Sequence, residues 1–242
     1  MSAVRPESPV LRLQAVTKSF AGRPAVDELS LELAAGEVYA LLGPNGAGKT
    51  TTLNLILGFD VPDKGTIEVG GSCVTRDPVA VRARMAYLPE TVMLHPSLSG
   101  MENLHYFSLL GGTRLCAAQM GRLLTEAGLP AAAHSQRTAV YSKGMRQKVG
   151  LAIALAKQAE LLLLDEPTSG LDVSAANEFS QLVRTASGRG MAVLMATHDL
   201  SRVTDVAHRL GVLRAGRLVF ESATAALSPA DLEASYLRQI AA

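Results

Sequence analysis

The sequence predicts an α/β fold in which a parallel sheet carries an N-terminal antiparallel β subdomain and an inserted α-helical subdomain. Three apolar runs without alternation, at 38–42, 161–164 and 191–196, are typical of strands that are covered on both faces in a parallel sheet. Apolar and polar residues alternate near the amino terminus, as they do in half-buried antiparallel strands. Between about 89 and 157 the apolar residues recur at helical spacing, which indicates an inserted lobe of helices.

The first elements are expected to be antiparallel strands at 11–16 and 29–34. Every second residue in each strand is apolar, so one face should be buried. The expected inner-face residues are Leu11, Leu13, Ala15, Leu29, Leu31 and Leu33. Residues 1–9 (MSAVRPESP) are rich in proline and polar residues and lack the apolar stretch of a signal peptide. We therefore expect a flexible N-terminal tail on a protein that stays inside the cell.

The later elements continue the α/β pattern. Apolar residues at helical spacing in 104–110 and 120–124 predict helices of the inserted lobe. A helix at 179–186, ended by glycines, should connect the second and third buried strands. The segment after Leu210 predicts a hairpin around 215–216 and then a weakly amphipathic end.

The composition is that of a chain with a sizeable core. Its 242 residues are 48% hydrophobic and 19% charged, so folding needs neither a metal nor a disulfide. The formal charge of +1 gives no electrostatic reason to expect a nucleic-acid partner. Cys73 and Cys116 lie far apart without metal-ligand spacing, and we assign them no function. Because no run of about 18 apolar residues occurs, we expect no direct insertion into a membrane.

A glycine-rich segment follows the apolar strand at 38–42 and matches the pattern GxxxxGK[ST] in the strand-to-helix context that this motif requires. An ordinary glycine-rich turn would rarely combine all these positions. The glycines let backbone N–H groups face a phosphate, Lys49 brings a positive charge to the β- and γ-phosphates of ATP, and the Thr50 hydroxyl would ligate Mg²⁺. The predicted nucleotide-binding residues are Gly43, Pro44, Asn45, Gly46, Ala47, Gly48, Lys49, Thr50 and Thr51.

Two carboxylates, Asp165 and Glu166, follow the four leucines at 161–164. Ligands bind at the carboxyl ends of the strands in open α/β sheets, where this pair is expected to lie. Asp165 suits the Mg²⁺ shell, and Glu166 suits the water that attacks the γ-phosphate. Alone the pair could be a solvated strand end, but together with the phosphate loop it indicates a catalytic site.

Five motifs follow one another along the chain. They are the phosphate loop, YSKGMRQ at 141–147, LLLLDEP at 161–167, SGLD at 169–172 and THD at 197–199. Their order, spacing and identity resemble those of ATP-binding cassette (ABC) ATPases, from Leu11 to about Phe220. The resemblance implies a single ABC ATPase domain at 10–242. Within it, the resemblance implies a RecA-like P-loop NTPase core at about 10–88 and 158–220, a helical subdomain at about 89–157 and a C-terminal tail at 221–242.

The resemblance also implies roles for five further residues. Phe20 would be the aromatic platform for adenine, with a core phenylalanine at a strand end as the alternative. Ser142 and Gly144, just ahead of the next helix, would approach the γ-phosphate of ATP held by the opposite subunit. Asp172 would lie at the subunit junction. His198 would contact the γ-phosphate and the attacking water, as a second catalytic residue.

Three positions depart from the commonest pattern of the family. Lys143 and Met145 replace the usual Gly and Gln of the signature, and Glu90 replaces the usual Gln. The variants resemble a branch of bacterial exporters whose membrane subunits are separate chains. Glu90 could still contact Mg²⁺ or water through its oxygen, so it counts among the nucleotide- and metal-binding residues. It also adds negative charge beside the pair at 165–166.

These features predict an ATPase subunit that powers export through separate transmembrane permease subunits. It would bind ATP and Mg²⁺ and close as a homodimer, or as a heterodimer with a second ABC ATPase subunit. It would lie in the cytoplasm, peripherally on the cytoplasmic face of the membrane, with the permease docked near 90–110. The cargo does not follow from this chain, because membrane subunits or external binding proteins select it in this family.

Two other classes of protein are alternatives to a transport subunit. A cassette ATPase that acts on DNA or ribosomes usually carries two cassettes or a long coiled-coil insertion, and this sequence has neither. A non-catalytic regulatory cassette would be expected to lose the base or the histidine, whereas Glu166 and His198 are both present. Co-purification with a hydrophobic membrane protein would separate a transport subunit from both classes.

Overall fold

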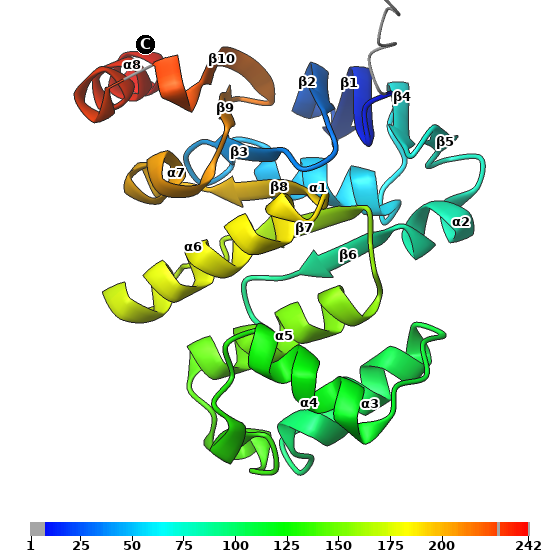
Figure 1. Cartoon of the computed structure of the whole chain (residues 1–242). Coiled ribbons are helices and arrows are strands. Elements are labelled where there is room, and N and C mark those ends of the chain that lie inside the picture. Colours follow the sequence, from blue (N-terminus) through cyan, green and yellow to red (C-terminus); the bar gives the residue numbers. More distant parts are fainter. Residues whose placement is uncertain (1–7, 227, 242) are drawn as a thin grey trace, which may run out of the picture.

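The central sheet lies between an antiparallel sheet and a lobe of helices (Figure 1). The computed structural model describes residues 8–226 and 228–241, and within them this sheet has six strands in the order β10-β9-β3-β8-β7-β6. β10 runs antiparallel to β9, and the other neighbours are parallel. The strands are β3 (Val38–Leu42), β6 (Met85–Leu88), β7 (Leu161–Asp165), β8 (Ala192–Thr197), β9 (Arg209–Arg214) and β10 (Arg217–Ala223). Every residue of β3, β7 and β8 is buried, as the non-alternating runs predicted.

Alternate side chains of the central strands pack into two cores. On one face, Tyr39 and Leu41 pack in a core with α1 (Lys49–Leu57) and the antiparallel sheet. On the other face, Val38 and Ala40 share a core with helices that include α6 (Val173–Gly188) and α7 (Leu200–Val206). Burial on both faces fixes β3, whose carboxyl end leads directly into the phosphate loop.

The antiparallel sheet has the order β2-β1-β4-β5 and comprises β1 (Leu11–Phe20), β2 (Arg23–Leu33), β4 (Lys64–Val69) and β5 (Ser72–Cys73). Leu11, Leu13 and the three predicted leucines of β2 are buried. The predicted inward position of Ala15 is wrong, because Ala15 is exposed and Val16 is buried. The pairing register shifts between Leu13 and Val16, where Ala15 adopts a φ of 46°, and this bulge turns Val16 inward.

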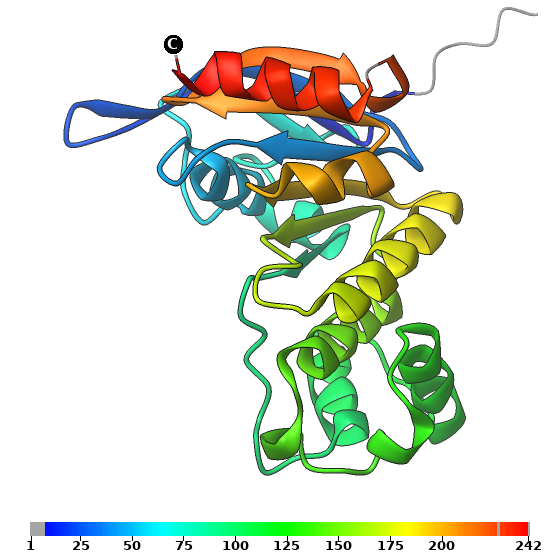
Figure 2. The same cartoon turned by 90° about the vertical axis from the view of Figure 1, so that its left-hand side faces the viewer.

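The inserted helices form a lobe at the end of the molecule opposite the antiparallel sheet (Figure 2). The lobe comprises α3 (Gly100–Leu110), α4 (Ala117–Glu126) and α5 (Lys143–Ala156), with 3-10 turns at Ala131–Ala133 and Thr138–Val140. A short helix, α2 (Pro78–Ala83), precedes β6. Ser99 starts α3 through a capping box with Glu102, which satisfies N–H groups that the helix itself leaves without partners. The strands β6 and β7 connect the lobe to the central sheet.

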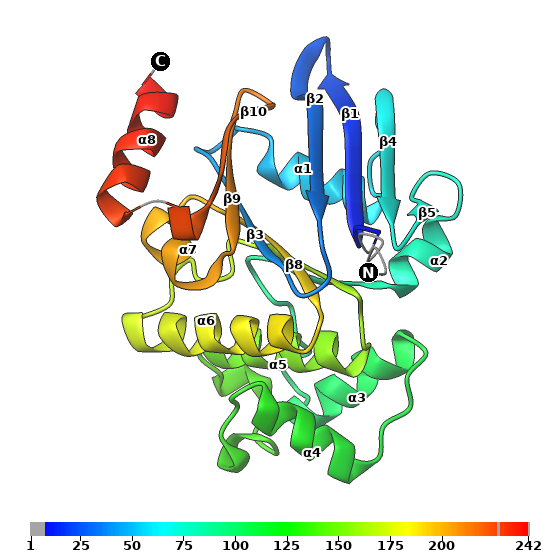
Figure 3. The same ribbon diagram turned by 45° about the horizontal axis from the view of Figure 1, so that its top comes forward.

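The β9–β10 hairpin turns at Ala215 and Gly216, as the sequence predicted. The Gly216 N–H donates to the Ala47 carbonyl at 2.9 Å, so the hairpin turn is hydrogen-bonded to the phosphate loop. After a 3-10 turn at Thr224–Ala226, α8 (Pro229–Ala241) packs beside β9 and α7 with Leu232 buried (Figure 3). Residues 1–7 of the predicted tail lie outside the described residues. Among those described, no helix combines the length and apolar character needed to cross a membrane.

Candidate nucleotide-binding site

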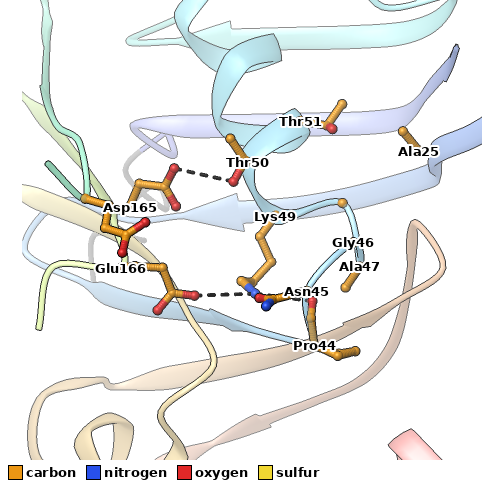
Figure 4. A pocket seen from close by; sticks show the side chains of 12 residues that line it. Ala25, Pro44, Asn45, Gly46, Ala47, Lys49, Thr50, Thr51, Asp165 and Glu166 are labelled. Carbon is orange, nitrogen blue, oxygen red and sulfur yellow. Dashed lines mark hydrogen bonds and ion pairs between the residues drawn. The ribbon is translucent and has the colours of Figure 1, made fainter. Parts of the chain in front are cut away.

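A cavity of about 260 Å³ opens where the phosphate loop faces the carboxyl end of β7 (Figure 4). Most of the predicted phosphate-loop residues line it, together with the three carboxylates predicted to serve Mg²⁺ or the attacking water. The lining residues are Ala25, Pro44, Asn45, Gly46, Ala47, Gly48, Lys49, Thr50, Thr51, Glu90, Asp165 and Glu166. Segments far apart in the sequence therefore meet at one edge of the central sheet, where α/β folds bind their ligands.

The phosphate loop owes its shape to glycine. Gly46 and Gly48 adopt φ values of 80° and 108°, which side chains rarely allow, and a Cβ on Gly48 would collide with the Ala25 carbonyl. The loop ends at Lys49, the first residue of α1, so the positive end of this helix points into the cavity region. Fixed N–H groups at a helix N-terminus suit an anion such as a phosphate.

The Lys49 side chain is folded back over the loop that carries it. Its ammonium donates to the Gly43 carbonyl at 2.6 Å and to the Pro44 carbonyl at 3.3 Å. It also lies 3.5 Å from Oε1 of Glu166, and the side chain is only 7% exposed. A full positive charge is thereby held in the cavity with only weak solvent screening.

Asp165 ends β7 beside Thr50, with 3.4 Å between Oδ2 and the threonine Oγ1. Burial, and then the negative charge of Glu166, raise the pKa of the Asp165 carboxyl above its ordinary value. Burial and the nearby Asp165 also raise the pKa of Tyr87 to about 12. The raised pKa shows that the Asp165 carboxyl is harder to ionise beside a second carboxylate. A divalent cation such as Mg²⁺ would offset this repulsion, and it prefers hydroxyl and carboxylate oxygens as ligands.

Glu166 is held from the end of β8. Its Oε2 accepts a hydrogen bond from Oγ1 of Thr197 at 3.1 Å, and its Oε1 lies 2.9 Å from Nδ1 of His198. The Glu166 backbone has a φ of 46°, a conformation that non-glycine residues seldom adopt and that is often found at functional sites. His198 does not line the cavity itself but contacts the carboxylate that does.

A second cluster lies outside the cavity and contains Ser142, Gly144 and Asp172. The Ser142 hydroxyl caps α5 by accepting the Met145 N–H at 3.2 Å, and Asp172 caps α6. The prediction that Gly144 precedes this helix is wrong, because α5 begins at Lys143 and Gly144 lies in its first turn. A Cβ on Gly144 would contact side chains of the loop and helix around Asp172, so the signature and SGLD segments are neighbours.

Phe20 ends β1 and does not line the cavity. Its side chain is 47% exposed, which contradicts the alternative of a core phenylalanine. Sequence reasoning missed Ala25, which lines the cavity from β2, because an alanine carries no chemical signal. It assigned no separate role to Ser169 of the SGLD motif, whose hydroxyl donates to Oε1 of Glu90 at 3.1 Å.

The fold and the cavity define a P-loop ATPase with an inserted helical lobe. The chain belongs to the ABC transporter family, whose model matches residues 26–169. It is thus an ABC ATPase, which hydrolyses ATP to drive transport. The predicted fold class is confirmed by a solved structure of a dimeric bacterial ABC transporter cassette, with a TM-score of 0.78 and 25% identity over 88% of this chain and 98% of that one.

Two relatives with opposite transport directions are similar to this chain. One is Nod factor export ATP-binding protein I of Paraburkholderia xenovorans, 38% identical over 90% of this chain and 72% of the relative. The other is an Fe(3+) ions import ATP-binding protein of Pseudomonas fluorescens, 37% identical over 86% of this chain and 60% of the relative. Membership of the family therefore does not by itself fix the direction of transport.

Proposed function

We propose that this chain is the ATP-hydrolysing subunit of an exporter and acts through separate transmembrane permease subunits. The observation that carries the catalytic part is the cavity in which Lys49, Asp165 and Glu166 converge. Export is supported by the similarity to the Nod factor export protein and by the signature variants Lys143 and Met145. In this proposal, residues 10–242 act as one ABC ATPase domain on the cytoplasmic face of the membrane.

The residues of the cavity suit hydrolysis of ATP. Lys49 and the loop N–H groups hold the β- and γ-phosphates, and Phe20 stacks on adenine. Thr50, Asp165 and Glu90 would hold Mg²⁺, which when bound neutralises phosphate charge and helps to orient the γ-phosphate.

Glu166 orients the attacking water and accepts its proton, and His198 fixes the Glu166 carboxylate. The 2.9 Å contact between His198 and Glu166 supports this division of roles.

A groove beside the helical subdomain is the proposed docking site of a permease subunit. A cavity of about 250 Å³ lies between β6 and the helices α3 and α5, and Phe107, Tyr87 and Ile153 are among its lining residues. Nearby, Met93 and Leu110 are 78% and 69% exposed. Exposed apolar side chains around a groove are a common sign of a protein interface.

The active unit in this proposal is a dimer in which Ser142 and Gly144 of one subunit reach the γ-phosphate bound by the other. The separation of their cluster from the cavity of the same chain supports this arrangement. The similar bacterial cassette of known structure is described as dimeric, which supports it further. Asp172, next to the signature segment, would lie at the junction.

Ser142→Arg should leave ATP binding by the monomer nearly unchanged and abolish the ATP-dependent dimer. The arginine adds bulk and charge to a surface that must approach the partner's nucleotide, whereas the cavity of the same chain is untouched. Sedimentation with and without ATP measures the dimer, and calorimetry measures the affinity. Ser142→Ala is the matched control, because it loses the same helix cap, worth about 1 kcal/mol, without the added bulk. Undiminished dimerisation of the arginine variant would refute the shared site.

A further inference from the structure

The ring of Phe20 carries a cation on one of its faces. The ammonium of Lys18, two residues earlier in β1, lies over the ring at 5.3 Å from its centroid. The Lys18 side chain is only 16% exposed, although the ring itself remains accessible to solvent. A cation over an aromatic face is attracted by the ring electrons, so Lys18 restrains the orientation of the ring.

Asp63 holds Lys18 and the end of β1 in place. Its Oδ2 accepts the Ser19 N–H at 2.7 Å, and its Oδ1 lies 3.4 Å from the Lys18 ammonium. Its own N–H donates to the Thr17 carbonyl at 2.8 Å. The Ser19 hydrogen bond, and then the charge of Lys18, lower the pKa of the Asp63 carboxyl, so it is ionised at neutral pH.

Asp63 also ties two parts of the proposed site together. It ends the loop that runs from α1 to β4, and α1 starts at the phosphate loop. Asp63 therefore links the segment that follows the phosphate loop and α1 to β1, the strand that carries Phe20. Neither Lys18 nor Asp63 lines the cavity beside the phosphate loop.

We propose that Lys18 and Asp63 are positioning residues that set Phe20 for stacking on the purine base of the nucleotide. The proposal rests on the role given to Phe20 in the proposed function. Lys18 covers one face of the ring and leaves the other to the base. By drawing electron density toward itself, the ammonium also improves stacking on an electron-rich purine. Asp63 fixes the lysine and the strand end, so the platform is in place before the nucleotide arrives.

The test compares binding of ATP with binding of inorganic tripolyphosphate, which has phosphates but no base. Calorimetry is carried out on the wild type, Lys18→Met, Asp63→Asn and Phe20→Ala. Lys64→Met is the matched control, because it removes the same charge from an exposed neighbouring position of β4. Lys18→Met and Asp63→Asn should weaken ATP binding by about three- to tenfold, and Phe20→Ala by about tenfold or more. Tripolyphosphate binding should remain at the wild-type level in every variant.

The outcomes separate this inference from the role of Phe20 itself. Wild-type ATP affinity of Lys18→Met and Asp63→Asn, alongside a loss in Phe20→Ala, would overturn the inference and leave the adenine platform standing. An equal loss for ATP and tripolyphosphate would also overturn it, because that result indicates general loosening of the site. If Phe20→Ala binds ATP normally, the platform and the inference both fail. In the Phe20→Ala background, Lys18→Met should cause no further loss.

Discussion

Lys49→Ala should weaken ATP binding by about 10- to 100-fold while the fold remains intact. The ammonium is the full positive charge nearest to the proposed phosphate position, and a hydrogen bond to a charged group contributes about 1.5–3 kcal/mol. Its loss also leaves Glu166 without the cation that lies 3.5 Å from it, so negative charge would face the incoming phosphates. Calorimetry measures the affinity, and circular dichroism checks the fold.

The fold should survive because the strands around Lys49 do not depend on its side chain. β3 is wholly buried, and the Gly43 and Pro44 carbonyls that the ammonium now contacts can accept hydrogen bonds from water. Lys64→Ala, at an exposed position of β4, is the control for loss of a lysine charge. Undiminished ATP affinity in Lys49→Ala would refute the assignment of the phosphate loop.

The parts of the fold that leave a repeating pattern in the sequence could be predicted. β3, β7 and β8 are covered on both faces and therefore show unbroken apolar runs. A bulge leaves no such mark, so the position of Ala15 was predicted on the wrong face. One extra residue in a strand moves the side chains after it to the opposite face of the sheet. Because apolar residues lie on both sides of this bulge, the sequence pattern does not show where the faces change.

The candidate site could be predicted where a residue brings its own chemistry. Lys49, Asp165 and Glu166 are charged residues at strand ends, and the structure brings them into one cavity. Ala25 lines the same cavity because β2 passes beside it, and an alanine side chain gives no signal of function in the sequence. Asp63 meets Lys18 across 45 positions of sequence, a contact set by the pairing of β1 with β4.

Glu166→Gln should cut ATP turnover by about 10²- to 10⁴-fold, the range that a positioned base contributes. The amide keeps nearly the same shape and can still accept a hydrogen bond from Thr197 through its oxygen. It cannot accept the proton of the attacking water. ATP binding should persist, because Lys49 and the loop N–H groups hold the phosphates without this carboxylate.

The same change should make the ATP-bound dimer accumulate. Removing a negative charge beside the γ-phosphate relieves repulsion, and slow hydrolysis delays the reopening of the dimer. Single-turnover kinetics measure the hydrolytic step, and size-exclusion chromatography with ATP measures the dimer. Slow turnover together with an accumulated dimer supports the role of Glu166. Turnover near that of the wild type would shift the role to Glu90 or His198.

The shared site between two subunits is tested most directly by mixing Glu166→Gln with Ser142→Arg in equal amounts before ATP is added. The Ser142→Arg subunit keeps Glu166, and the Glu166→Gln subunit keeps Ser142. One site of a mixed dimer therefore combines an intact phosphate loop and base with an intact signature from the partner. We predict that the mixture hydrolyses ATP faster than either variant alone. A rate equal to the mean of the two separate rates would contradict a site built from two subunits.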